Sequence, residues 1–186
     1  LSFAVRAGEG WYIPLSHHYL GVPEQLPRAL VLDTLRPLLE DPALKKIGQN
    51  IKFDALVLAH AGVELRGIET DTMIASYLAQ PAAKSHGMDA LASDLLGYRT
   101  ISYSEVTGSG RNQVTFDQVE IEKATVYAAE DADITLRLAE KLLPMVAASA
   151  EARVLRAELQ AARDRLAALE SERAAGERIV REFGAA

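Results

Sequence analysis

Residues 45–62, with the sequence KKIGQNIKFDALVLAHAG, decide the fold. Lys45 to Gly48 is a candidate for a short strand, and residues 49–62 have the apolar content of a helix that ends at Gly62. A short strand followed directly by a helix is the unit from which α/β domains are built. The stretch therefore predicts an α/β domain.

Further short elements lie on both sides of this stretch. Two apolar segments at residues 2–5 and 11–15 flank a glycine-bearing turn, which is typical of a β-hairpin. The polar residues 98–118 are expected to form a loop or a partly ordered segment. Helical spacing and capping residues predict helices at residues 28–40, 71–78, 88–96 and 119–143, the last ending near Pro144.

The composition changes after about Val146, where residues 147–182 are rich in Ala, Glu and Arg. Apolar residues with a 4-3 spacing predict an amphipathic helix of roughly two heptads here. They are Leu155, Leu159, Ala162, Leu166 and Leu169. We therefore divide the chain into a domain at residues 1–145 and a helical tail at residues 146–186. The tail helix is expected either to be solvated or to pair with another helix.

Composition excludes several classes of protein. The chain has 186 residues, no cysteine and a net charge of −6. Disulfides, thiolate catalysis and Cys-ligated zinc are excluded, and the four histidines lack zinc-binding spacing. Any metal site must therefore rest on carboxylates, which favours Mg²⁺ or Mn²⁺. The acidity argues against a protein that coats duplex DNA, and no apolar run approaches the ~20 residues of a membrane helix.

The predicted helix at residues 119–143 carries a carboxylate within an apolar stripe. At about 100° per residue, one face of this helix is shared by four residues. They are Tyr127, Asp131, Ile134 and Leu138. Asp131 is therefore expected to be buried, whereas Glu130 and Asp133 point elsewhere and are interpreted as solvated charges.

The helix at residues 49–62 carries a second carboxylate of this kind. Its stripe consists of Asn50, Asp54, Val57, Leu58 and Ala61. A buried carboxylate without compensation is costly or becomes neutral. Two of them, Asp54 and Asp131, favour convergence on a divalent cation. The alternative is that each one caps a neighbouring backbone or pairs with an Arg or Lys.

These residues also carry a family resemblance. The segment GQNIKFD at residues 48–54 resembles the second motif, N-x3-D, of the DEDD exonucleases. The segment YAAED at residues 127–131 resembles their third motif in its tyrosine form, Y-x3-D. The order of the motifs, their separation of about seventy residues, and segments such as ELRGIETDTMIASYL resemble the 3′–5′ exonuclease domain of bacterial DNA polymerase I. The resemblance covers roughly residues 1–145.

The resemblance implies an RNase H-like exonuclease fold and two-metal hydrolysis of a 3′-terminal phosphodiester, with Mg²⁺ or Mn²⁺ as the ions. By the match to the motifs, Asp131 is expected to ligate metal directly, with Asp54 as the partner carboxylate. Tyr127 is expected to orient the attacking water. The resemblance also implies a single-stranded DNA 3′ end as substrate, a polymerase domain as partner, and a cytoplasmic location in a bacterium.

Four further residues match positions that contact the single strand in this family. Gln49, Asn50 and Phe53 match positions that line the cleft, and Tyr103 matches an aromatic that touches a base near the 3′ end. Stacking on an aromatic ring tolerates any base, as proofreading requires. For Phe53 and Tyr103 the alternative is ordinary core packing.

The chain also departs from the family. The first motif, D-x-E, would lie on a strand just upstream of LSFAV, and the first forty residues contain no D-x-E. We therefore expect an RNase H-like fold that lacks its first strand, and weak or absent activity for this chain alone. Ser85 stands where the family often has a basic DNA contact. Two alternatives remain: a non-catalytic exonuclease-like module, and an interaction protein that acts through its C-terminal helix.

Overall fold

The computed structural model describes residues 1–183, with side chains at 1–149 and 153–174. The chain divides into two compact units, Leu1–Val146 and Ala147–Ala186. Across the described residues, no helix combines the length and the apolar content needed to cross a bilayer.

The first unit opens with the predicted hairpin, formed by β1 (Ser2–Arg6) and β2 (Glu9–Tyr12). The two strands are antiparallel, and Phe3 lies opposite Trp11. Gly8 supplies a positive φ of 84°, which a residue with a side chain rarely adopts in such a tight turn. The hairpin expected from the two apolar segments is therefore confirmed.

Residues 45–62 form the first two elements of a parallel βαβ unit. β3 (Lys46–Gly48) leads through Asn50 into α2 (Ile51–His60), and the chain returns as β4 (Ile68–Asp71), parallel to β3. The predicted strand and helix are confirmed. β4 was not predicted, because IETD has little apolar pattern and becomes a strand only by pairing with β3.

Two helices flank the βαβ unit in the sequence, and both were predicted. α1 (Arg28–Leu39) buries Leu32 and Leu39 in a cluster with Leu58 of α2. α3 (Thr72–Ala79) follows β4 directly and is capped by the preceding aspartate, as its sequence indicated.

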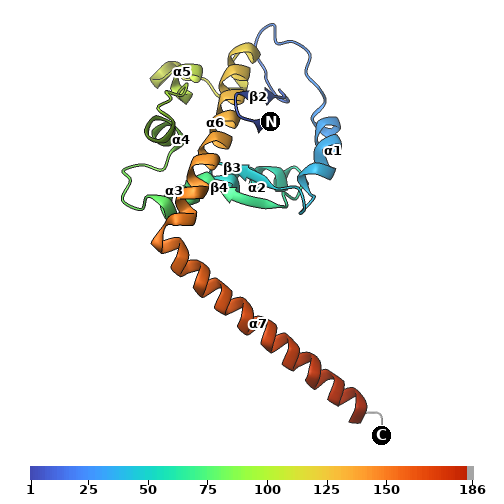
Figure 1. Cartoon of the computed structure of the whole chain (residues 1–186). Coiled ribbons are helices and arrows are strands. Elements are labelled where there is room, and N and C mark those ends of the chain that lie inside the picture. The colour runs from blue at the N-terminus through green and yellow to red at the C-terminus, as the bar shows by residue number, and fades with distance from the viewer. Residues whose placement is uncertain (184–186) are drawn as a thin grey trace. The chain divides into compact units, whose positions relative to one another are not determined.

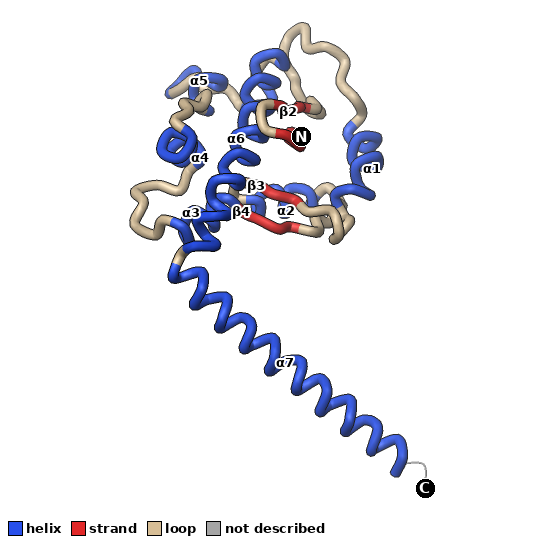
Figure 2. The backbone as a smooth tube through the Cα atoms, in the orientation of Figure 1, coloured by secondary structure: helices blue, strands red, loops and turns tan. Residues whose placement is uncertain are grey.

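The strands belong to two separate two-stranded sheets, β1–β2 and β3–β4 (Figures 1 and 2). No strand joins the two sheets within residues 1–183, so each strand has one edge without a strand partner. The α/β class is confirmed.

The segment between α3 and the last helix of the unit is more ordered than expected. α4 (Met88–Leu91) continues into a π-helical turn (Ala92–Leu96), in agreement with the predicted helix at residues 88–96. The expected loop at 98–118 contains α5 (Tyr103–Thr107), which is stabilised by a capping box between Ser102 and Glu105. The segment is thus partly ordered, one of the two expected outcomes, although α5 itself was not predicted because its single turn is too short to show periodicity.

α6 (Ile121–Ala148) crosses the middle of the first unit (Figure 1). It was expected to end near Pro144 but continues beyond it. A proline in a helix removes the hydrogen bond to the carbonyl four residues earlier, here that of Glu140. Glu140 lies on the exposed side of α6, where the helix tolerates this loss more readily than in the core.

The hairpin packs tightly against α6. A Cβ atom on Gly10 of β2 would lie only 2.1 Å from the carbonyl oxygen of Ala129. Only glycine permits this close approach of two backbones. Further along α6, Ile134, Leu138 and Leu142 are completely buried and form its core-facing stripe.

The second unit is dominated by α7 (Ala150–Phe183), a single long helix (Figure 1). All of its described side chains, at residues 153–174, are exposed to solvent.

Candidate functional site

Asp131 lies on the face of α6 that the sequence assigned to it. Ile134 and Leu138 on this face have no exposed surface. Asp131 itself is half-buried, and its Oδ1 atom is buried without a hydrogen-bond partner among the described residues. A buried carboxylate oxygen without a donor is uncommon, because nothing compensates for its lost hydration. Oδ1 therefore has the capacity to coordinate a further group.

Burial raises the pKa of Asp131 from 3.8 to about 7, and the negative charges of Glu130 and Asp89 add to this rise, although a hydrogen bond from Tyr127 opposes it. The pKa of Tyr127 is raised well above its usual value, first by burial and then by the charge of Asp131 and the hydrogen bond to it. The phenol is thus held in its neutral form beside a desolvated carboxylate. The local excess of negative charge favours a cation at this point.

Tyr103 lies beside Tyr127 in a small aromatic cluster. The ring centroids of these two residues are 6.3 Å apart in an edge-on arrangement. Tyr103 also stacks with Phe116 at 6.3 Å, and Phe116 lies 5.7 Å from Tyr127. With 46% of its surface exposed, Tyr103 packs on one side and faces solvent with the rest. The predicted base-contacting residue is therefore next to the predicted water-orienting residue.

The backbone around Gln49 and Asn50 is held by β4 and the residues after it. Asn50 is the only described non-glycine residue with positive φ, at 56°, and its N–H donates to Asp71 Oδ1 at 2.9 Å. The Gln49 amide donates to the His86 carbonyl at 3.0 Å and accepts from Thr72 Oγ1. The side-chain nitrogen and oxygen of Gln49 thus both have hydrogen-bond partners within the protein, and these partners fix the orientation of the side chain.

Asp54 lies on an exposed face of α2, and the expectation that it is buried in an apolar stripe was wrong. Val57, from the same predicted stripe, is 53% exposed, whereas Ile51 and Leu58 form the buried side of the helix. No described residue covers the outer face, although it is apolar. The exposure of Phe53, 63%, excludes core packing for that ring.

Phe53 lines a shallow apolar cavity on this face, with a volume of about 530 Å³. Its other lining residues are Asn50, Lys52, Ala55, Leu56 and Ile68. Two of the predicted strand-binding residues, Asn50 and Phe53, thus border one cavity. The described ring contacts do not link Phe53 to Tyr103.

The electrostatic neighbours of Asp54 differ from those of Asp131. Although Asp54 is exposed as a whole residue, partial desolvation of its carboxyl raises its pKa; a hydrogen bond from its own backbone opposes this rise, and the charge of Asp71 adds to it. None of the described interactions links Asp54 to Asp131. The described residues also contain no group of three or more His, Asp or Glu side chains arranged to hold a metal ion.

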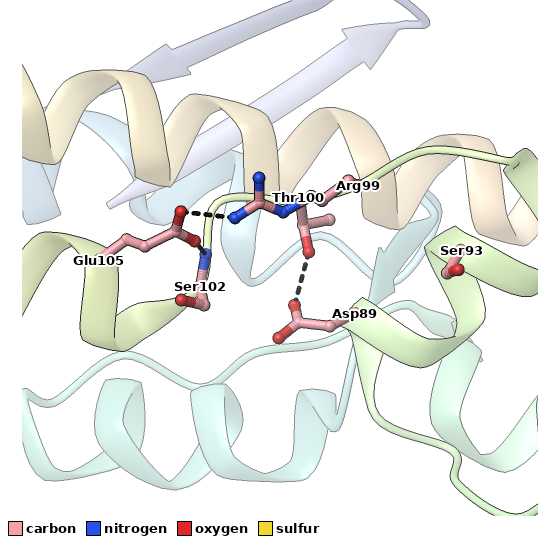
Figure 3. A pocket seen from close by; sticks show the side chains of 6 residues that line it. All are labelled: Asp89, Ser93, Arg99, Thr100, Ser102 and Glu105. Atoms are coloured by element: carbon pink, nitrogen blue, oxygen red, sulfur yellow. Dashed lines mark hydrogen bonds and ion pairs between the residues drawn. The ribbon is translucent and has the colours of Figure 1, made fainter.

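Asp89 is a neighbour of the site that the sequence did not single out. It raises the pKa of both Asp131 and Tyr127 and accepts a 2.8 Å hydrogen bond from Thr100 Oγ1. It also lines a cavity of about 540 Å³ (Figure 3). The remaining lining residues are Ser93, Arg99, Thr100, Ser102 and Glu105. An acidic residue in the first turn of α4 has an ordinary capping explanation, so no sequence pattern identified it.

Glu130 and Asp133 were expected to be free solvated charges, but both accept hydrogen bonds from other segments of the chain. Glu130 accepts from the Tyr98 hydroxyl at 2.8 Å and from the Ile101 N–H at 2.7 Å. Asp133 accepts from the Gly8 N–H at 2.6 Å, far away in the sequence. Both side chains attach neighbouring segments to α6, which a helical wheel cannot show.

The residues present fit a divalent cation in part. Mg²⁺ is commonly held by one or two carboxylates, with water and substrate phosphate completing its shell. The unpartnered Oδ1 of Asp131 suits one such ligand. A second ion would require more carboxylates than the described residues bring together.

Residues 1–147 match a protein family described as 3′–5′ exonuclease. Among curated relatives, DNA polymerase I of Pseudomonas aeruginosa is 53% identical over 144 residues, which is 76% of this chain and 16% of that protein. DNA polymerase I of Rhizobium leguminosarum is 44% identical over 146 residues, 74% of this chain and 14% of that protein. The chain thus spans about a sixth of the length of these relatives.

Two solved structures have the same fold over most of the domain. Brucella melitensis NrnC bound to pGG is 25% identical with a TM-score of 0.52, covering 74% of this chain and 61% of that one. The POL domain of Pol1 from M. smegmatis, in complex with DNA primer-template and dNTP, has a TM-score of 0.51 and 24% identity, covering 66% of this chain and 18% of that one. These likenesses agree with the RNase H-like exonuclease fold expected from the motifs. The chain therefore belongs to the 3′–5′ exonuclease family represented in bacterial DNA polymerase I.

Proposed function

We propose that this chain serves as the proofreading part of a DNA polymerase I-type protein, removing nucleotides from the 3′ end of single-stranded DNA. The observation that carries this proposal is Asp131, whose Oδ1 is buried without a partner beside the neutral hydroxyl of Tyr127. A polymerase domain is the proposed partner, and the bacterial cytoplasm is the proposed location, because the relatives are bacterial DNA polymerases.

Asp131 is proposed to hold a divalent ion directly, and Asp54 is proposed to act as the second carboxylate, partly through water. Mg²⁺ or Mn²⁺, when bound, supplies charge stabilisation at the scissile phosphate and lowers the pKa of a bound water. With two ions, both the attacking and the leaving oxygen are stabilised. Burial raises the pKa of Asp131, so its charged form is unfavourable without a compensating charge. A bound cation would supply that charge and favour the carboxylate form, which supports this assignment.

Tyr127 is proposed to orient the attacking water through its hydroxyl. Because the pKa of Tyr127 is raised, the phenol keeps its proton at neutral and moderately alkaline pH. It can then donate one hydrogen bond and accept another without adding charge. Tyr103 is proposed to stack on a base near the 3′ end, because part of its ring faces solvent next to Tyr127.

Gln49, Asn50 and Phe53 are proposed to line the path of the strand. The exposed Phe53 ring offers a stacking surface, and the internal hydrogen bonds of Gln49 keep the adjoining backbone in place. This arrangement suits a substrate whose sequence is arbitrary, since stacking does not discriminate strongly among bases.

Low activity of this chain alone is also proposed, because the described residues bring together too few carboxylates for two ions. Release of 3′-terminal nucleotides from a labelled single strand should be slow with Mg²⁺ or Mn²⁺, and Asp131→Asn should abolish what remains. Asp94→Asn, which alters an exposed carboxylate on the π-helical turn, is the matched control and should leave the rate unchanged. Fast turnover by this chain would contradict the proposed impairment.

A non-catalytic exonuclease-like module is the second candidate, favoured by the same shortage of carboxylates. Calorimetric titration with Mn²⁺ separates the two candidates without depending on turnover. A competent site binds Mn²⁺ through Asp131, so that Asp131→Asn abolishes the heat signal. If no Mn²⁺ binds to the unaltered chain while a fluorescent single strand still does, the non-catalytic reading is correct.

A further inference from the structure

We propose that α7 associates with α7 of a second copy of this chain as a short, parallel, in-register coiled coil. The proposal concerns the second compact unit, Ala147–Ala186, and is independent of the exonuclease site. It rests on the shape of the apolar stripe of α7 and on the charges that flank this stripe.

The apolar stripe of α7 is narrow and faces solvent. Leu155, Leu159, Leu166 and Leu169 are each between 51% and 61% exposed. With Ala162 they follow a 4-3 spacing, so all five fall within about 80° of the helix circumference. A helix that packs on a globular core usually has an apolar face wider than about 100°. The narrower stripe of α7 is typical of a coiled-coil seam.

Charged residues flank this seam on both sides, where a helix packed on a core would need further apolar residues. With Leu159 and Leu166 at the a positions, the e positions are Arg156, Arg163 and Glu170. The g positions are Glu158, Arg165 and Glu172. These positions determine partner choice and orientation in coiled coils.

The flanking charges match a parallel, in-register pair. In this arrangement each g residue faces the e residue five positions later in the other helix. Glu158 then faces Arg163, and Arg165 faces Glu170, so both kinds of contact join opposite charges. An antiparallel pair over the same seam would instead place Arg165 next to its own copy, with repulsion between like charges.

The described part of α7 leaves the flanking charges available for such contacts. Within residues 153–174, no ion pair involves Glu158, Arg163 or Glu170. On the opposite side of the helix, by contrast, Gln160 donates to Asp164 Oδ1 at 2.8 Å. Arg165 donates only to a carbonyl of its own helix, that of Ala161 at 3.3 Å. Among the described residues, the flanking charges therefore have no ion-pair partner that a second helix would have to displace.

Sedimentation equilibrium of the full chain tests the association. With a seam of only about two heptads, we expect a weak monomer–dimer equilibrium, with a dissociation constant of roughly 10–500 µM. Leu159→Glu combined with Leu166→Glu should abolish the dimer. The matched control, Ala161→Glu combined with Ala168→Glu, adds the same charge on the opposite side and should leave dimerisation unchanged. A purely monomeric wild-type chain throughout this range would overturn the proposal.

A charge exchange tests the orientation. Glu158→Arg alone and Arg163→Glu alone each create two like-charge contacts in a parallel dimer, so each variant should dimerise at least several-fold more weakly. An equimolar mixture of the two single variants restores two opposite-charge contacts and should form a heterodimer near wild-type strength. If the mixture does not regain dimerisation, the parallel register is rejected. Circular dichroism spectra and thermal transitions of the two variants that equal those of the wild type exclude misfolding as the cause.

Discussion

Replacing Asp131 with Asn should stabilise this protein while removing the proposed metal ligand. The Oδ1 atom of Asp131 is buried without a hydrogen-bond partner among the described residues, and burial raises the pKa from 3.8 to about 7. In the metal-free protein the charged form therefore works against folding. Asparagine keeps the size of the side chain but has no charge, so the unfavourable charge is removed.

The magnitude follows from the shift in pKa. A rise of about three units, at about 1.4 kcal/mol per unit, sets an upper limit of roughly 4 kcal/mol on the destabilisation by charged Asp131. The neutral Asn oxygen also accepts a weaker hydrogen bond from Tyr127 than the carboxylate does, which offsets part of this gain. We therefore expect a net gain of about 1–3 kcal/mol at pH 8, or a rise of roughly 3–9 °C in Tm.

The dependence on pH has a definite sign. The folded-state pKa lies above the unfolded-state value, so the folded protein binds the extra proton. The stability associated with protonated Asp131 is fully present below pH ~3.8 and is lost as the pH rises to about 7. The wild type should therefore lose stability across this window, whereas the Asp131→Asn variant should lack this part of the slope.

Urea denaturation in EDTA, at several pH values between about 4 and 8.5, measures the effect. Asp94→Asn is the matched control and should change neither stability nor slope, because its carboxylate is exposed. Addition of Mg²⁺ or Mn²⁺ at pH 8 should raise the stability of the wild type but not of the Asp131→Asn variant. A variant no more stable than the wild type at pH 8 would refute our view of Asp131 as an uncompensated charge.

Three further changes test the structure around the site. Gly10→Ala should destabilise the domain by about 1–3 kcal/mol in thermal unfolding, because its Cβ atom would lie 2.1 Å from the Ala129 carbonyl oxygen. Gly87→Ala, where the nearest atom is 3.5 Å away, is the control and should have little effect; equal costs would disprove the close packing of hairpin and α6. Asn50→Ala should lower the free energy of unfolding by about 1 kcal/mol, because φ is 56° at this position and alanine rarely adopts it. Asn50→Gly should cost much less. Equal losses for the two variants would show that the side chain, and not the backbone, matters. Glu130→Ala should remove two hydrogen bonds and lower the free energy of unfolding by about 1–3 kcal/mol. Hydrogen exchange at the Ile101 amide should become faster. Unaltered exchange at this amide would contradict the role of Glu130 in holding α6 to residues 98–101.

Local patterns in the sequence predicted most of the elements. The glycine-bearing turn between apolar segments predicted the hairpin, and the cap at Asp71 predicted the start of α3. One exception was an element whose stability comes from a partner. β4 exists through pairing with β3. Two further exceptions have other causes: α5 is too short to show periodicity, and α6 continues through Pro144 at an exposed position of the helix.

The buried face of α6 was predictable from the sequence, but the arrangement of the candidate site was not. The helical spacing from Tyr127 to Leu138 placed Asp131 correctly, since α6 buries the face that its apolar residues define. The same reasoning failed for Asp54, because no described residue covers that face of α2. Periodicity shows which side chains share a face, but not which faces another element will cover.

The sequence alone therefore determined the α/β class, the motifs that carry the family and the alignment of Asp131 with the core of α6. Only the tertiary structure showed that the strands form two sheets, that Tyr103 lies beside Tyr127, and that the charge of Asp89 acts on Tyr127. It also showed that Glu130 and Asp133 hold distant segments. The physical reason is that helix periodicity and capping depend on neighbours in the chain. Burial, pKa shifts and strand pairing depend on groups brought together from distant parts of the sequence.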